Sequence, residues 1–507
     1  AYYRLGYYEN AIKEFEEVLR LNPGDFKVHY DLGRACIAKK EFDRAVEEFE
    51  KILRREPENT EVRLMLGETY YGSGSVREAV EEFEKILETD PQNTEAKFNL
   101  GQIYFNQKEY RKAERLLKEV GKVRDDFGVH YELGVIYRKL GEFNKAIKEF
   151  NEAGKLKNDF RVHYELGCIY QKQNRVDDAI KEFNKALRLK PDFREAKYRL
   201  GIAYMDSEQA DSAIREFLEY MRLGGDLSAH LNLGKIYMKL NNLTRAETEF
   251  IKVLDLESTN YDAHVNLGYI YQKQGKFDNA IKEFNKALRL KPDSFDVHYS
   301  LGVIYRRKEE YELAIKELKK ALKLKPDSDV RFVLAKSYLD AEMYDKAITE
   351  FKEVLKKNDS DEVHLNLGIA YYRKKDTSNS IKEFQEVLKK KNIPEVHYYL
   401  GLAYRDKGEF DKAIEEFKEV LKMNPDAEAH YQLGNIYLRL KEYKKAIEEF
   451  KEVLRINSEH RKAHFDLGIA YKEAGEIEKA VEEFKEVLKM SLDFEAYYQL
   501  GMIYYTQ

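Results

Sequence analysis

The stretch HVNLGYIYQKQGKFDNAIKEFNKALRLKP, residues 264–292, contains the unit from which the whole chain is built. Its second half, AIKEFNKALRLKP, recurs residue for residue at 179–191, and looser copies run along the entire sequence. In the quoted copy, Leu267, Gly268 and Tyr271 have spacings that place them on one face of a helix. The first half of the unit is therefore predicted to be a helix with one packed face.

The second half of the unit predicts another helix, joined to the first by a short turn. Ala280, Phe284 and Leu288 share one face of this second helix. The polar segment 273–276 separates the two halves, and Pro292 closes the second helix because proline cannot continue it. The unit is therefore predicted to be a helical hairpin.

Small residues repeat with a fixed period. A glycine after leucine marks each first helix at steps of 33 or 34 residues, with Ala335 as the one substitute, namely Gly33, Gly67, Gly101, Gly134, Gly167, Gly201, Gly234, Gly268, Gly302, Gly368, Gly401, Gly434, Gly468 and Gly501. An alanine of the second helix keeps the same period, and Ser380 is its only substitute. Glycine inside a helix costs about 1 kcal/mol relative to alanine. We therefore expect a packing reason, with glycine of one helix lying against alanine of another.

The pattern L-G-x-x-Y, A-x-x-x-F and a closing proline resembles the tetratricopeptide repeat family. The resemblance covers nearly all 507 residues and implies an all-α fold, an α-solenoid in which antiparallel helix pairs stack into a right-handed superhelix. The chain departs from the family in having no tryptophan. Where the family often places tryptophan, three residues before the leucine, this chain mostly has histidine.

Length and ends define the expected domain organisation. A single globular core stops growing at about 250–300 residues, whereas a solenoid does not, because each repeat packs only on its neighbours. We expect residues 1–507 to form one continuous array of fourteen complete helix pairs with partial repeats at both ends. The chain opens with Ala1-Tyr2-Tyr3 inside a first helix and stops at Gln507 inside another. Without an initiator methionine or capping helices, we expect an excised segment of a longer protein.

Composition limits the partners that we expect. Charged residues make up 36% of the chain and its net charge is −5, which gives no attraction to nucleic acid or acidic membranes. No apolar run approaches the roughly 18 residues of a membrane span. Cys36 and Cys168 lie four repeats apart without metal-ligand spacing, so we expect free thiols. Free thiols fit a cytoplasmic protein without excluding other compartments.

The histidines are the first candidates for a metal-binding, pH-sensing or catalytic role. Ten of the eleven histidines fill one repeat position, and only His460 stands apart. Equivalent residues in stacked hairpins are separated by about 10 Å, which is too far for neighbouring histidines to share a metal. We therefore expect a structural role, with pH sensing as the alternative.

No other pattern in the chain specifies catalysis. There is no Ser/His/Asp or Cys/His set and no glycine-rich phosphate loop. Acid pairs such as Glu47-Glu48 and Glu415-Glu416 belong to second helices and are interpreted as solvated faces. The sequence therefore predicts a protein that is not an enzyme and that needs no cofactor or metal.

The inner face of the first helices is the candidate binding surface. With each glycine numbered as position 8, positions 2, 5, 9, 12 and 13 form a stripe, which in the family lines the concave groove where peptides lie. Position 5 is aromatic in eleven of fifteen copies, partly for packing, position 9 is mostly apolar, and positions 12 and 13 supply lysine and arginine. The predicted partner-binding residues are Tyr131, Val135, Arg138, Lys139, Tyr164, Cys168, Lys172, Lys239, Tyr269, Lys273, Tyr299, Val303, Arg306 and Arg307.

These residues favour a non-catalytic protein–protein interaction scaffold, with contacts in 127–172 and 231–307. An apolar floor with a basic flank suits an amphipathic protein or peptide segment that carries acidic residues. The chaperone-binding members of the family clamp a terminal carboxylate with Lys, Asn and Arg. Here position 9 is asparagine only at Asn435, so we do not expect that ligand. Glycosyltransferase-associated arrays carry asparagine ladders at position 6, which is interrupted here.

Three further functions stay open. The array could be an architectural strut or a ring-forming, self-associating component of a larger assembly, by analogy with bacterial motility, secretion and envelope complexes. It could also be the interaction arm of an enzyme whose catalytic domain lies outside these residues. RNA binding, as in pentatricopeptide arrays, requires a longer period and a basic groove, against the net charge of −5.

Overall fold

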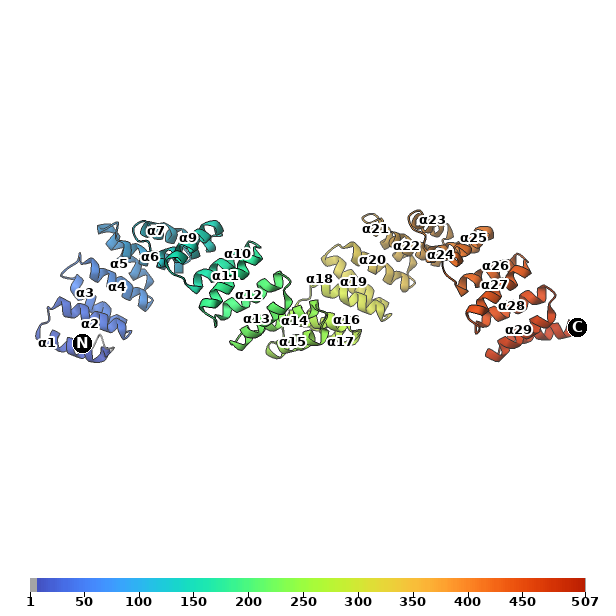
Figure 1. The fold of residues 1–507 in the computed structure, drawn as a ribbon, viewed down its shortest axis with the longest axis horizontal. Helices are drawn as coiled ribbons and strands as arrows, with labels where there is room; N and C mark the ends of the chain where they lie inside the picture. Colours follow the sequence, from blue (N-terminus) through green and yellow to red (C-terminus); the bar gives the residue numbers. More distant parts are fainter. Residues whose placement is uncertain (1–6, 507) are drawn as a thin grey trace. The chain divides into compact units, whose positions relative to one another are not determined.

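The computed structural model describes residues 7–506, which form 30 α-helices and no strand. The chain divides into two compact units, residues 1–256 and 257–507. Within each unit, consecutive helices pack side by side in chain order (Figure 1). The predicted all-α solenoid of helix pairs is therefore confirmed. The expected helix at Ala1-Tyr2-Tyr3 lies outside the described residues, as does Gln507.

The first unit contains α1 to α15. Its first helices are α2 (Phe26–Ala38), α4 (Thr60–Ser73), α6 (Thr94–Asn106), α8 (Phe127–Lys139), α10 (Phe160–Lys172), α12 (Arg194–Asp206) and α14 (Leu227–Lys239). Its second helices are α1 (Tyr8–Leu21), α3 (Phe42–Leu53), α5 (Val76–Thr89), α7 (Tyr110–Gly121), α9 (Phe143–Leu156), α11 (Val176–Leu189), α13 (Ala210–Arg222) and α15 (Leu243–Leu256).

The second unit contains α16 to α30. Its first helices are α16 (Tyr261–Lys273), α18 (Phe295–Arg307), α20 (Ser328–Asp340), α22 (Asp361–Arg373), α24 (Pro394–Lys407), α26 (Ala427–Arg439), α28 (Arg461–Glu473) and α30 (Phe494–Thr506). Its second helices are α17 (Phe277–Leu290), α19 (Tyr311–Leu324), α21 (Tyr344–Leu355), α23 (Thr377–Leu388), α25 (Phe410–Met423), α27 (Tyr443–Ile456) and α29 (Ile477–Met490).

The repeated glycine is required by a phenylalanine of the same hairpin. A Cβ atom added to Gly268 would lie 2.5 Å from Cε1 of Phe284, which is closer than real Cβ contacts. Phe284 is fully buried and stands four residues after the alanine of the second helix. In most hairpins glycine therefore makes room for an aromatic ring, whereas Gly101 and Gly302 make room for Leu117 and Leu318. Our expectation named the alanine of the second helix, and at Gly302 the carbonyl oxygen of Ala314 lies 3.4 Å from the added Cβ.

Apolar contacts join each hairpin to the next. Ala280, Phe284 and Ala287 of α17 form one buried cluster with Val297 and Leu301 of α18. The apolar core therefore continues across the repeat boundary, as stacking of neighbouring repeats requires.

The turn within every complete hairpin contains one left-handed residue. Gly275, with φ +73°, fills this place between α16 and α17. Asn174, Lys375 and Glu309 adopt the same conformation in other hairpins at some conformational cost. A single residue with positive φ therefore sets the reversal of the chain.

The ten equivalent histidines hold the two helices of their hairpins together. The Nδ1 atom of each lies 2.5–2.7 Å from Oε2 of a glutamate nineteen residues later, as in His29–Glu48, His130–Glu149, His163–Glu182, His230–Glu249, His264–Glu283, His298–Glu317, His364–Glu383, His397–Glu416, His430–Glu449 and His464–Glu483. Arg63 with Glu82 and Arg331 with Glu350 make the same link in other hairpins. These histidines therefore have a structural role.

The second ring nitrogen of several histidines also meets an acceptor. Nε2 of His298 lies 2.9 Å from the carbonyl oxygen of Pro292, and Nε2 of His130 lies 2.8 Å from Oδ1 of Asp125. The oxygens of an ionised Asp125 only accept hydrogen bonds, so both contacts of His130 are satisfied when both of its ring nitrogens carry a proton. At His130 the pKa of the imidazole is raised above its ordinary value, because burial lowers it but the hydrogen bonds to Glu149 and Asp125 raise it by more.

The interpretation of the acid pairs as solvated faces was wrong for one member of each pair. Glu48 is only 5% exposed and binds His29, and half-buried Glu416 binds His397. Glu47 and Glu415, their neighbours, are exposed. Adjacent acids on a helix point about 100° apart, so one can face the first helix while the other faces water.

Two hairpins lack part of the usual packing. Ser380 replaces the alanine of the second helix in α23; it is fully buried, and its Oγ has no hydrogen-bond partner among the described residues. Ala210 begins α13 where other second helices mostly begin with a larger apolar residue. These hairpins are the places where we expect the weakest local stability.

Candidate partner-binding surface

The position 5 tyrosines of the first unit lie half-buried between helices. The ring of Tyr131 in α8 lies 5.8 Å from that of Phe150. The ring of Tyr164 in α10 lies 6.0 Å from that of Phe183 and 4.9 Å from that of Phe193. Each ring therefore packs on the phenylalanine of its own hairpin, and Tyr164 also contacts Phe193 at the start of the next repeat, while part of each ring stays accessible.

Four of the predicted residues surround one hollow of about 220 Å³ in the first unit. Its lining consists of Arg138, Tyr164, Glu165, Cys168, Gln171, Lys172 and Arg199. These side chains come from α8, α10 and α12, so three successive first helices contribute to one recess. The stripe proposed from helical spacing thus brings Arg138, Tyr164, Cys168 and Lys172 together.

Desolvation controls the chemistry of this hollow. Burial is the main reason that the pKa of Tyr164 is raised to about 12, and it also raises the pKa of the Cys168 thiol. Both groups are therefore protonated near neutral pH, which does not favour a nucleophilic cysteine. The hollow therefore offers neutral Tyr164 and Cys168 among the charged side chains of its lining, Arg138, Glu165, Lys172 and Arg199.

Part of the predicted basic flank is neutralised by the chain itself. Nε of Arg138 lies 2.6 Å from Oε2 of Glu165 in the next first helix, and the Nε of Arg306 lies 2.7 Å from Oδ2 of Asp340. At position 13, Nζ of Lys239 lies 2.6 Å from Oε1 of Glu208. These three cations are therefore not free to meet a partner without breaking an ion pair.

The cations that stay accessible are mainly at position 13. Exposed Lys139, Lys172, Lys273 and Arg307 make no ion pair within 4 Å in the described part of the chain. Position 13 therefore supplies the unpaired charge of the stripe, whereas position 12 mainly links neighbouring repeats.

The predicted residues of the second unit lie on α16 and α18. The ring of Tyr269 packs edge-on against Phe284 at 5.3 Å, and that of Tyr299 stacks on Phe295 at 6.5 Å. Burial is the main reason that the pKa values of both tyrosines are raised. Val303, a position 9 residue of the same stripe on α18, is half-buried. This region repeats the combination of partly accessible rings and position 13 cations.

The stripe omitted position 6, which the structure shows to be important. Glu165 and Arg199 both occupy it and line the hollow of the first unit. Position 12 reaches position 6 of the next repeat, as in Arg138 with Glu165 and Lys472 with Gln499 at 2.9 Å. Both pairs are separated by 27 residues. A search for complementary side chains at that spacing could have found these contacts.

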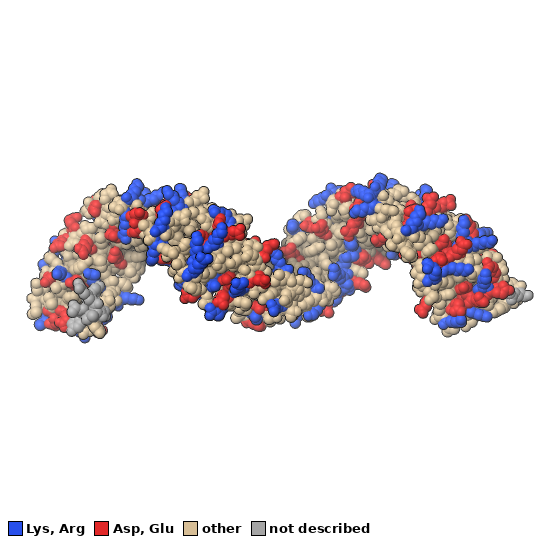
Figure 2. Space-filling model, in the orientation of Figure 1, with Lys and Arg blue, Asp and Glu red and all other residues tan. Residues whose placement is uncertain are grey.

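The visible face of the molecule carries both signs of charge (Figure 2). Figure 2 shows lysine and arginine interspersed with aspartate and glutamate over the visible face. Among residues 7–506, no group of three or more His, Cys, Asp or Glu side chains is arranged to hold a metal ion. None of the helices described has both the length and the apolar composition needed to cross a membrane.

Family models match most of the chain. Two models described as tetratricopeptide repeat match residues 398–460 and 437–501. The model of the cilia and flagella-associated protein 70 C-terminal domain matches 132–363, and that of the tetratricopeptide repeat protein 21 C-terminal ARM domain matches 11–200. The chain is a tetratricopeptide repeat protein. Stacked repeats of this kind present extended binding surfaces, which defines its general class as a protein-interaction scaffold.

Three solved structures that match this chain have low sequence identities and low TM-scores. The Cut9–Hcn1 hetero-tetramer of the APC/C is 18% identical over 87% of this chain and 96% of that chain, with a TM-score of 0.36. A tetratricopeptide repeat protein from Parabacteroides merdae is 17% identical over 48% of this chain and 98% of that chain, with a TM-score of 0.36. YrrB, described as a TPR protein with an unusual peptide-binding site, is 24% identical over 36% of this chain and 94% of that chain, with a TM-score of 0.32. A comparison with curated proteins finds no match.

Proposed function

We propose that this protein is a non-catalytic scaffold that holds a segment of a partner protein against the stripe of its first helices. The observation that carries the proposal is the hollow lined by Arg138, Tyr164, Cys168 and Lys172. Partly buried rings and a small recess suit apolar anchors of the partner, since such anchors contribute most of the binding energy at interfaces.

The charge of the partner segment follows from the accessible cations. Lys139 and Lys172 in the first unit, and Lys273 and Arg307 in the second, make no ion pair among the described residues. Acidic side chains beside the apolar anchors would complement them. The same combination in both units supports one class of partner, an amphipathic or extended segment with acidic residues.

The test compares two charge reversals of equal size on the same two repeats. Lys139→Glu with Lys172→Glu changes the stripe, whereas Lys148→Glu with Lys181→Glu changes exposed positions of the second helices α9 and α11. Arg138 is left unchanged because a glutamate there would face Glu165. Proteins retained by the intact chain in a pull-down are identified, and retention by both variants is then measured.

We expect the first variant to lose its partner and the second to keep it, with unchanged helical circular dichroism in both. Equal retention by the wild-type chain and by the stripe variant would exclude this surface. Loss of retention in both variants would indicate a charge effect of the whole chain rather than a site.

A further inference from the structure

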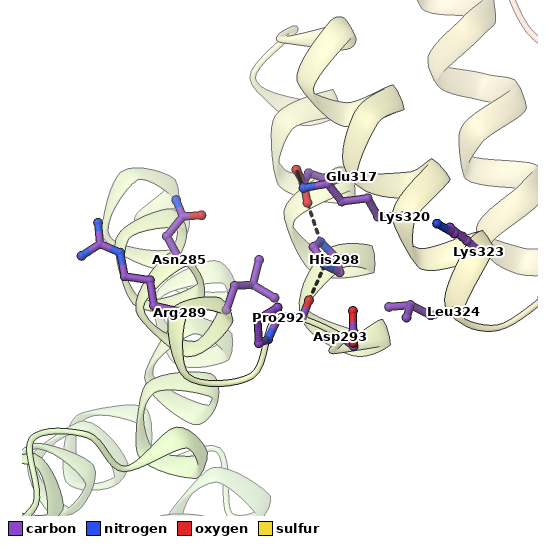
Figure 3. A pocket seen from close by; sticks show the side chains of 10 residues that line it. Asn285, Arg289, Pro292, Asp293, His298, Glu317, Lys320, Lys323 and Leu324 are labelled. Atoms are coloured by element: carbon purple, nitrogen blue, oxygen red, sulfur yellow. Dashed lines mark hydrogen bonds and ion pairs between the residues drawn. The ribbon is translucent and has the colours of Figure 1, made fainter.

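A second and larger hollow lies in the second unit between the second helices α17 and α19. Its volume is about 720 Å³. Figure 3 shows Asn285 and Arg289 on α17 at one side, Lys320 and Lys323 on α19 at the other, and His298 between them. The stripe described above belongs to first helices, so this hollow is a separate surface.

The polar groups at the base of the hollow are held in place. Nδ1 of His298 lies 2.5 Å from Glu317 and its Nε2 lies 2.9 Å from the Pro292 carbonyl oxygen, as the dashed lines in Figure 3 mark. Nζ of Lys320 donates to Glu317 at 2.9 Å. Pro292 also lines the hollow with Leu288 and Leu324, so the hollow includes apolar surface.

Two cations of this hollow lack a partner because of the residues that precede them. Three residues before Arg289 and Lys323 stand Lys286 and Lys320, which bind Glu283 and Glu317 at 2.8 and 2.9 Å. Neither Arg289 nor Lys323 makes an ion pair among the described residues. They leave the lining with a net positive charge, since Glu317 is neutralised and Asp293 is the remaining acid.

In other second helices, the cation equivalent to Arg289 and Lys323 is neutralised by an ion pair. A glutamate three residues earlier binds the equivalent cation in Glu353–Lys356, Glu419–Lys422 and Glu452–Arg455, at 2.5, 2.5 and 2.7 Å. Along the sequence, α17 and α19 are the one pair of neighbouring second helices that both carry two basic residues at these positions. The charge of this hollow is therefore a local feature and does not follow from the repeat.

We propose that the hollow between α17 and α19 is a second protein-binding site, which takes an acidic segment of a partner with an apolar side chain beside its carboxylates. The carboxylates meet Arg289 and Lys323 on opposite walls. The apolar side chain contacts Leu288, Pro292 and Leu324 at the base. Charge complementarity selects such a segment because the unpaired cations on both walls would repel a basic one.

The test uses the full chain and an array of synthetic peptides of about 12 residues, in which leucine and glutamate occur in varied order. A second array carries glutamine in place of glutamate. Binding is compared for the wild-type chain, for Arg289→Glu with Lys323→Glu, and for Lys422→Glu with Arg455→Glu. The last variant changes the equivalent positions of α25 and α27, where the cations are already paired.

We expect the wild-type chain to bind peptides of the glutamate array and the α17–α19 variant to bind them at least about tenfold more weakly. The α25–α27 variant keeps this binding. Peptides that the stripe variant Lys139→Glu with Lys172→Glu still binds are the ones assigned to the hollow between α17 and α19. Should the double reversal disturb helical circular dichroism, Arg289→Gln with Lys323→Gln shows the same loss to a smaller extent.

Several outcomes would overturn the proposal. These are a glutamate array that no chain binds, glutamine peptides that bind equally well, and an α17–α19 variant that retains binding. Loss in the stripe variant alone would place acidic-peptide binding on the first helices, and it would support the function proposed above while removing this second site.

Discussion

In α24 and α25, Nδ1 of His397 lies 2.5 Å from Oε2 of Glu416, nineteen residues further along the chain. The same link between a first and a second helix recurs in the other hairpins with histidine at this position. It places a polar, charge-dependent bond where the tetratricopeptide pattern often has tryptophan.

Breaking this link is predicted to weaken the hairpin locally. Glu416→Gln removes the charge of a half-buried acceptor, at a cost of about 2 kcal/mol. Glu415→Gln is the matched control, since this neighbouring acid is exposed. Hydrogen exchange of α24 and α25 measures the difference, and equal protection in both variants would contradict the role assigned to Glu416.

The stability of the hairpins that contain His130 and His364 is predicted to depend on pH. Burial lowers the pKa of His130, but its hydrogen bonds to Glu149 and Asp125 raise the pKa by a larger amount, so the net pKa lies above 6.5. The pKa of His364 is raised in the same way, because its hydrogen bonds to Glu383 and Asp359 outweigh the effect of burial. A raised pKa in the folded state gives stability that is fully present below pH 6.5 and is lost as the pH rises through the folded pKa.

This pH dependence can be measured in α8 and α9. Hydrogen exchange there, corrected for its intrinsic rate, should show less protection at about pH 9 than at about pH 6. His130→Gln should show a smaller difference between the two pH values, because glutamine does not titrate. If variant and wild type change equally, His130 is not the group responsible.

Ser380→Ala is predicted to stabilise the α22–α23 hairpin by about 1 kcal/mol, because it removes a buried hydroxyl that has no hydrogen-bond partner in the described chain. Alanine already fills this place in the other second helices. Ser378→Ala, at an exposed position of the same helix, should change stability by less than about 0.5 kcal/mol. Urea unfolding of both variants tests this, and equal effects would mean that burial at Ser380 is not the cause.

The same hairpin and the α12–α13 hairpin are predicted to open more readily than the rest. Ser380 and Ala210 both reduce apolar burial, at about 25 cal/mol per Å² of lost area. Hydrogen exchange should therefore be faster in 370–390 and 200–220 than in the corresponding segments of other hairpins. Uniform exchange along the chain would show that the remaining contacts compensate.

Gly434→Ala is predicted to cost about 1–3 kcal/mol through overpacking, since the added Cβ would lie 2.5 Å from the buried ring of Phe450. Gly501→Ala is the matched variant at the same repeat position. Its Cβ would meet no atom within 4 Å, so the higher helix propensity of alanine should stabilise α30 by up to about 1 kcal/mol. Thermal unfolding compares the two. Destabilisation by both variants would point to a backbone effect rather than to the ring.

The candidate surface could be predicted only in part. Helical spacing groups Tyr164, Cys168 and Lys172, since residues four apart share a helix face, and these three residues line one hollow. It could not show that Arg138 is paired with Glu165, because that contact joins different repeats and depends on how the hairpins stack. The same limit applies to the hollow between α17 and α19, whose walls are far apart in sequence.

The sequence alone determined the repeat, its period and the helical hairpin, because these depend on local spacing and on residues that start, turn or end helices. The tertiary structure decided which side chains meet. It showed that Gly268 makes room for Phe284 and that His264 binds Glu283. The physical reason is that such contacts depend on the packing angle and distance between helices, which no periodicity within one helix specifies.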